Sequence, residues 1–238
     1  MTLPKINVPE YSLVVPSTNE EIKFRPFLVK EEKLLLLSQE SGDEKDLYIA
    51  IKNLVNNCCF GKIDVDKLPL FDIEYVFLQI RAKSVNEIAD VKVICPDDGE
   101  TEVDIKVDLT KVQVHIDDKH NSKIPLTDDI GIVMSYPNLA SVLLTANKED
   151  EVLSDANKMF QMIQDCMLQI WQGEETFDAT DYTDKDKKDF LESLNHKQFE
   201  KVSQFFETMP TVKHEVEITN PKTQVVSKVE LEGMNSFF

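Results

Sequence analysis

An α+β fold is predicted by the order in which apolar patterns change along the chain. Alternating apolar residues occur in blocks at 6–29, 88–116 and 211–231, and residues with helical spacing lie between these blocks. Single alternation of strands and helices is typical of parallel α/β sheets, so separate blocks of each favour α+β. We expect an N-terminal β-hairpin, a helical core, two ribbon-like antiparallel β-hairpins and a C-terminal helical lobe.

The first block predicts a β-hairpin followed by a helix. Residues 8–15 and 22–28 are alternating or continuously apolar, and the Pro-Ser-Thr-Asn sequence at 16–19 is typical of a turn. From Lys30 the spacing becomes helical, and the helix is expected to end near Ser41 and Gly42.

Two more helices complete the predicted N-terminal core. Ser41 and Glu44 have the spacing of a capping box, which predicts the start of the second helix. The third helix follows Pro69 and covers 71–82, where apolar residues form two stripes. A helix that is apolar on two sides is typical of a buried central position, so we expect it to form the core of this half.

Beyond this core the sequence predicts a hairpin and then a helical region. The hairpin covers 88–116 with a turn at 96–99, and a short strand follows near 130–134. Asn138 is expected to cap a run of helices that continues through Trp171.

The last third is expected to begin with an acidic loop at 173–189. Helix starts are indicated by Thr183 with Asp186 and by Asn195 with Gln198. The second of these helices is expected to stop at Pro210. A hairpin and an aromatic tail then complete the chain.

The organisation suggests two lobes. One is an N-terminal α+β lobe, 1–120, that contains the hairpin 88–116. The other is a helical lobe, 121–238, that ends in the hairpin 211–231 and the tail. Because no Gly/Ser/Pro-rich linker separates them, a single integrated domain is the alternative.

The charge balance points to a protein partner. The chain carries 26 Lys and Arg against 44 Asp and Glu, a net charge of −18. Such a surface repels phosphate backbones and anionic lipid, so we expect neither a nucleic-acid nor a membrane partner. The sequence has no apolar run of about 20 residues and no basic region followed by an apolar block at its start. A soluble cytoplasmic protein is therefore expected.

The cysteines suggest neither a disulfide framework nor a complete metal site. Cys95 begins a Cys-Pro-Asp-Asp-Gly turn, in which Asp98 stands where a zinc knuckle has its second thiol. The turn at 220–223 has a similar outline and no thiol. One sulfur and one carboxylate are too few for a tetrahedral zinc site. We therefore expect two hairpins that keep ribbon geometry without a metal, and no cofactor.

Other catalytic patterns are lacking as well. The five aspartates between 178 and 189 have no glycine in the frame that an EF-hand needs, so a solvated loop is expected there. The histidines have no metalloprotease spacing, and the sequence contains neither a Gly-x-Ser-x-Gly elbow nor a phosphate-binding glycine loop. No carboxylate pair is singled out by its spacing. The chain is therefore not expected to be an enzyme.

The C-terminal tail carries the candidate partner-binding residues. Met234, Phe237 and Phe238 lie beyond Gly233, where a chain end is normally polar. They either fold back to complete the core or form an exposed anchor that docks into a partner's pocket.

Four blocks resemble a known family over nearly the whole chain. They are residues 20–33, 71–85, 205–210 and 233–238. Together they resemble the baseplate hub assembly family of T-even-like contractile-tailed bacteriophages. Family members often carry Cys-x-x-Cys-Gly turns, and this chain departs from that pattern at Asp98, Asn220 and Thr223.

The resemblance implies a late phage protein that works in the cytoplasm of the infected host during virion morphogenesis. Its partners would be phage baseplate hub proteins, and its role that of an assembly chaperone absent from the finished particle. The alternative is a structural subunit of the central hub that stays in the virion. A hub-associated hydrolase is a third reading, which no catalytic pattern supports.

Overall fold

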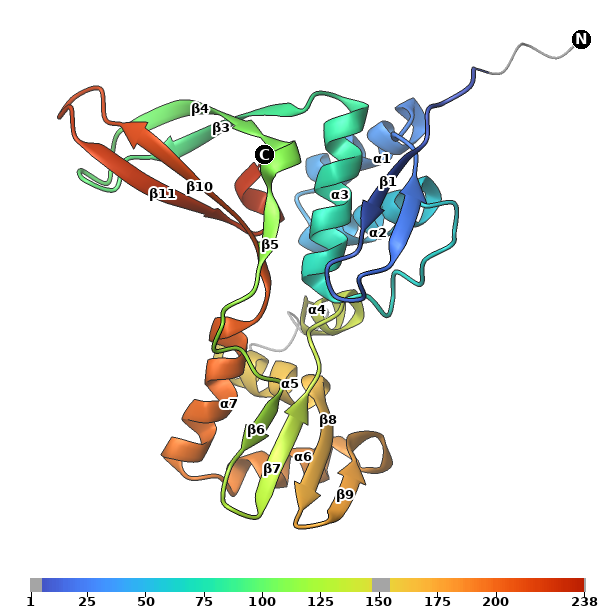
Figure 1. Cartoon of the computed structure of the whole chain (residues 1–238), viewed down its shortest axis with the longest axis vertical. Coiled ribbons are helices and arrows are strands. Elements are labelled where there is room, and N and C mark those ends of the chain that lie inside the picture. The colour runs from blue at the N-terminus through green and yellow to red at the C-terminus, as the bar shows by residue number, and fades with distance from the viewer. Residues whose placement is uncertain (1–5, 147–154, 238) are drawn as a thin grey trace, which may run out of the picture. The chain divides into compact units, whose positions relative to one another are not determined.

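The chain folds as the α+β protein that the sequence predicts. The computed structural model describes residues 6–146 and 155–237, which form seven α-helices and eleven strands in small antiparallel sheets (Figure 1). The chain divides into two compact units. Unit 1 contains Met1–His115 and Thr211–Phe238, and unit 2 contains Ile116–Pro210.

The C-terminal hairpin belongs to unit 1, which differs from the expected division into 1–120 and 121–238. Strand β5 (Gln113–His115) pairs with β10 (Thr211–Thr219), with Val114 opposite Val212. A three-residue strand has too short a pattern to reveal its partner, so the sequence did not predict this pairing.

The N-terminal hairpin of unit 1 is shorter than expected. Strands β1 (Tyr11–Val14) and β2 (Glu21–Phe24) pair with Tyr11 opposite Phe24. The second strand ends at Phe24 and not at residue 28, because the backbone N–H of Arg25 leaves the ladder and donates to the Cys58 carbonyl at 3.0 Å.

Two longer hairpins occupy another part of unit 1. Strand β3 (Ile88–Ile94) pairs with β4 (Glu102–Asp108), and β10 pairs with β11 (Val226–Glu232). A 3₁₀ turn, η1 (Leu109–Lys111), connects β4 to β5. Both hairpins were predicted from alternating residues.

Three helices form the remainder of unit 1: α1 (Val29–Ser41), α2 (Glu44–Cys58) and α3 (Leu70–Ser84). The cap of α2 is Asp43, whose carboxylate accepts from the Lys45 N–H at 2.9 Å, and not Ser41 as predicted. Ser41 instead belongs to the last turn of α1.

Helix α3 is the central helix that its two apolar stripes predict. It packs against α2, β5 and β10 and is buried on several sides. Even a carboxylate, that of Asp72, is fully buried, and it accepts hydrogen bonds from the N–H and the hydroxyl of Ser17. The buried residues of α3 are Phe71, Asp72, Ile73, Val76, Phe77, Leu78, Ile80 and Ala82.

Unit 2 is built on a four-stranded antiparallel sheet in the order β6-β7-β8-β9. Two strands lie where the sequence predicted other structure: 167–172 is strand rather than helix, and part of the acidic loop is strand. The Trp171 side chain lies so close to Gly131 on β7 that a Cβ there would be 1.9 Å from its ring. The strands are β6 (Lys123–Pro125), β7 (Ile130–Met134), β8 (Met167–Gln172) and β9 (Glu175–Asp178).

Helices cover this sheet and complete a second core. The capping boxes predicted at Thr183 with Asp186 and at Asn195 with Gln198 are both present. Ile132, Ile163 and Phe205 are among the buried residues that join sheet and helices. The helices of unit 2 are α4 (Leu139–Ala146), α5 (Asp155–Cys166), α6 (Asp184–Glu192) and α7 (His196–Thr208), with a 3₁₀ turn η3 (Ala179–Asp181). Of these, α5, α6 and α7 contribute buried residues to the core.

Candidate functional site

The two turns that resemble knuckles share one backbone geometry. The Gly99 N–H donates to the Cys95 carbonyl at 2.9 Å, and the Gln224 N–H donates to the Asn220 carbonyl at 2.9 Å. Gly99 and Gln224 both have positive φ, at 69° and 62°. The similar outline of the turns in sequence therefore reflects similar local structure.

Side chains join the two turns directly. The Asp97 carboxylate accepts from Nδ2 of Asn220 at 3.0 and 3.1 Å and from the Thr223 hydroxyl. These hydrogen bonds, from Thr223 first and then Asn220, lower the pKa of Asp97. Sequence reasoning missed Asp97, because it examined only the positions where knuckles have thiols.

Asp98 and Cys95, which occupy the positions where a zinc knuckle has its thiols, lie within the first of these turns. The Asp98 carboxylate accepts from the hydroxyl and N–H of Thr101 and the N–H of Glu100, which lowers its pKa. The Cys95 side chain is buried. No group of three or more His, Cys, Asp or Glu placed to hold a metal occurs among the described residues. Hydrogen bonds thus connect the turns where a ribbon would have its metal.

Two of the three tail residues, Met234 and Phe237, lie in the core of unit 1 and not on its surface. Met234 and Phe237 are buried in the 3₁₀ turn η4 (Met234–Phe237), while Phe238 lies outside the described residues. Gly233, at φ 69°, turns the chain back and donates its N–H to the Val212 carbonyl at 2.9 Å. The hypothesis of an exposed anchor does not fit Met234 and Phe237, whereas core completion does.

A carboxyl of α3 holds this turn. The N–H of Met234 donates to Glu74, which lies next to Gly233. Burial, together with the smaller effect of the nearby Glu232, raises the pKa of Glu74 to about 7, although the Met234 N–H acts in the opposite direction. The tail is therefore attached by a titratable group that the sequence did not single out.

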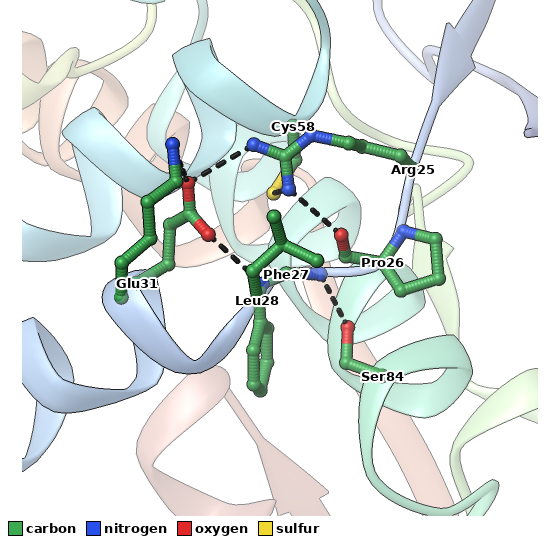
Figure 2. Close-up of polar contacts among 8 residues, drawn as sticks. Arg25, Pro26, Phe27, Leu28, Glu31, Cys58 and Ser84 are labelled. Atoms are coloured by element: carbon green, nitrogen blue, oxygen red, sulfur yellow. Dashed lines mark hydrogen bonds and ion pairs between the residues drawn. The ribbon is translucent and has the colours of Figure 1, made fainter. Parts of the chain in front are cut away.

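A second polar cluster of unit 1 surrounds Glu31 (Figure 2). One Glu31 oxygen lies 3.0 Å from Nη2 of Arg25 and 3.2 Å from Nζ of Lys30, and the other accepts from the Leu28 N–H at 2.8 Å. Burial favours a higher pKa for Glu31, but these hydrogen bonds together lower it. Arg25 also donates to the Pro26 carbonyl at 2.9 Å, so this ion pair fixes the chain between β2 and α1.

The thiols are poor nucleophiles, because only the thiolate reacts. Burial raises the pKa of Cys58 to about 11, and those of Cys59 and Cys166 to about 12. All four cysteines are free and buried.

One histidine of unit 2 has two side-chain partners. Nδ1 of His120 lies 3.0 Å from the Thr208 hydroxyl, and Nε2 lies 3.0 Å from the Tyr136 hydroxyl. Because the Thr208 hydroxyl donates to the Gln204 carbonyl, it accepts from Nδ1, and Nε2 accepts from Tyr136. Burial lowers the pKa of His120, so it is a neutral, packed residue against Phe205.

Two aspartates of the acidic segment cap local structure. Asp178 accepts from the Thr180 N–H at 2.9 Å, and Asp186 accepts from the N–H and hydroxyl of Thr183. These hydrogen bonds lower the pKa values of Asp178 and Asp186. These two aspartates therefore stabilise the first turns of η3 and α6.

An apolar groove of about 520 Å³ opens in unit 2 beside the sheet and α6. Ile170 and Phe177 line it from the strands, and Phe190 lines it from the helix. Tyr182, 43% exposed, stands edge-on to Phe177 with ring centroids 6.5 Å apart. Asp186 and Lys187 also line the groove and add charge to it.

Within the described residues, no helix has both the length and the apolar character needed to cross a bilayer. A sequence model described as T4 bacteriophage base plate protein matches residues 8–238 and so covers both units. No curated protein and no solved structure matches the chain.

Proposed function

The chain belongs to the T4 bacteriophage base plate protein family, and from this premise we propose that it is a non-catalytic assembly factor for the baseplate hub. It binds hub proteins during tail morphogenesis in the cytoplasm of the infected cell and leaves before the particle is finished. The observation that carries the proposal is the family match over 8–238, together with the sequence blocks that resemble hub assembly proteins.

The state of the reactive side chains supports binding rather than catalysis. A general acid, base or nucleophile must reach its substrate with a suitable pKa. Here the Glu31 and Asp72 carboxylates are buried and hydrogen-bonded, and the thiol of Cys58 has a pKa of about 11. These groups are therefore held inside the fold and away from a substrate.

The groove of unit 2 offers a surface for a hub protein. Its apolar lining suits an apolar side chain of a partner, and the exposed ring of Tyr182 is the kind of aromatic group that dominates protein interfaces. Asp186 and Lys187 supply polar groups that would fix the orientation of the bound segment.

Pull-down of tagged protein from infected cells tests the binding. We expect hub proteins to be recovered by the wild type and lost with Tyr182→Ala. The matched control is Thr176→Ala, at an exposed position of β9 that does not line the groove, and it should behave as wild type. Equal recovery with Tyr182→Ala would show that another surface binds the hub.

Mass spectrometry of purified phage particles tests the transient role. An assembly factor should be found at trace level or not at all. Recovery at hub copy number would instead identify a structural subunit of the hub and contradict our proposal.

A further inference from the structure

Helix α1 has an inverted distribution of polar and apolar residues. Surface helices normally bury their apolar side and expose their polar side. In α1 the buried residues are Glu31, only 2% exposed, and Ser38. Val29 is 78% exposed, Leu36 54% and Leu37 51%. An exposed row of large apolar residues on one helix is typical of an interaction surface.

The polar groups on the buried side of α1 form their hydrogen bonds within unit 1, and Leu36 and Leu37 take no part in them. Glu31 is held by Arg25 and by the Leu28 N–H, as Figure 2 shows, and the Ser38 hydroxyl donates to the Leu35 carbonyl at 2.8 Å. Since the inward polar groups are paired, the helix is fixed in an orientation that leaves Leu36 and Leu37 outside.

The exposed stripe also has an ordered charge pattern. Lys33, Leu36, Leu37 and Glu40 are spaced by three, one and three residues, so they lie on one side of the helix, and all four are exposed. The arrangement is symmetrical about the point between the two leucines. A cation lies toward the helix N-terminus and an anion toward the C-terminus.

Such a stripe is complementary to itself in the antiparallel direction. When a second α1 lies antiparallel with its centre at the same point, Leu36 faces Leu37 of the copy and Lys33 faces Glu40. The antiparallel arrangement also places the positive end of each helix dipole beside the negative end of the other, which is favourable. A parallel copy would place Lys33 opposite Lys33 and Glu40 opposite Glu40.

We propose that this stripe, Lys33, Leu36, Leu37 and Glu40, is the centre of a two-fold symmetric homodimer contact. A two-fold contact uses the same patch on both subunits, which is what a self-complementary stripe provides. The order of charges favours a second copy over an unrelated partner, because the stripe contains its own complement. The proposal does not depend on the hub-binding role.

The dimer should be weak. One helix side is smaller than the roughly 800 Å² per partner of a standard interface. The net charge of −18 also opposes association of two copies. We therefore expect a dissociation constant in the micromolar range or above at physiological salt.

Sedimentation of the full chain over a range of concentrations tests the contact. Wild type should show a reversible monomer–dimer equilibrium. Lys33→Glu places two acidic pairs across the two-fold axis, and Glu40→Lys places two basic pairs. Each should weaken the homodimer roughly tenfold, from the scale of exposed ion pairs. Circular dichroism melting curves should be unchanged, since both positions are exposed.

Mixing the two single variants distinguishes this contact from any other. An equimolar mixture of Lys33→Glu and Glu40→Lys chains restores both attractive pairs, so it should dimerise about as well as wild type. The double variant should do the same with itself. Leu36→Ala with Leu37→Ala should abolish dimerisation.

Three results would overturn the proposal. One is a wild type that stays monomeric up to several hundred micromolar, which would leave the stripe to a different protein. Another is dimerisation of the single charge variants as strong as that of wild type, which would place the contact elsewhere. The third is failure of the mixture to recover, which would refute the antiparallel register.

Discussion

Replacement of Phe237 by alanine tests whether the tail is part of the core of unit 1. Phe237 is 0% exposed and lies in η4, which also contains buried Met234. Truncation of a buried phenylalanine removes its transfer free energy and leaves a cavity, which typically costs about 3–5 kcal/mol. That is a large part of the roughly 5–15 kcal/mol by which proteins are stable.

Urea and thermal unfolding followed by circular dichroism measure this change. We expect Phe237→Ala to lower the melting temperature by on the order of 10 °C for a chain of this size. Val226→Ala on β11 is the control, because that residue is 56% exposed and the change should cost well under about 1 kcal/mol. The two variants lie in the same unit, so their difference isolates burial.

The opposite result would restore the anchor hypothesis. If Phe237→Ala were as stable as wild type, the side chain would not be packed in the core. A chain shortened by residues 234–238 that stayed stable but no longer captured hub proteins would then show an exposed docking tail. A shortened chain that unfolds at lower temperature would agree with the structure.

Four further outcomes are expected. Phe77→Ala on α3 should cost about 3–5 kcal/mol in urea unfolding, because Phe77 is almost fully buried; unchanged stability would contradict its central position. The raised pKa of Glu74, about 7 against 4.5, means that the folded state holds a proton which the unfolded state releases. Its contribution is present below pH 4.5 and is lost as the pH rises through 7, so Glu74→Gln should flatten the stability profile between pH 5 and 8. Chelator should leave the melting temperature unchanged, whereas a drop or stoichiometric zinc after dialysis would reveal a metal. Asp97→Ala should increase amide hydrogen exchange in both turns, and exchange raised only in its own turn would refute the connection to Asn220.

Local signals were sufficient to predict much of the fold. The capping boxes at Thr183 and Asn195 are where the sequence placed them, because each depends on residues within one helical turn. The buried position of α3 follows from its two apolar stripes. Alternation likewise predicted the hairpins of unit 1, in which partner strands are neighbours in sequence.

Non-local contacts account for the main differences. Strand β8 was predicted as helix, since Met167–Gln172 contains no turn residues and its strand partner β7 is more than 30 residues earlier. The pairing of β5 with β10 joins segments almost 100 residues apart, and it places the C-terminal hairpin in unit 1. Neither contact leaves a periodic pattern in one segment.

Non-local contacts also limited what the sequence could predict about the candidate sites. Knuckle-like turns at Cys95 and Asn220 were recognised from their sequence, but their connection through Asp97 depends on how the two hairpins approach each other. The tail was recognised as unusual, and its aromatic residues allowed both burial and exposure. The burial of Met234 and Phe237 in the folded chain decides between the two for these residues.

The orientation of α1 shows how one buried ion pair determines a whole surface. Four consecutive leucines, 34–37, are spread around a helix at about 100° per residue, so apolar burial alone favours no single side. The Arg25–Glu31 pair fixes residue 31 inside. Positions 33, 36 and 40 then lie about 140–200° away from it, on the solvent side. Leucines at such positions add nothing to the core, and a buried charge pair costs desolvation without guaranteeing stability. The pair therefore contributes specificity: it selects the one orientation that presents Leu36 between Lys33 and Glu40 to another molecule.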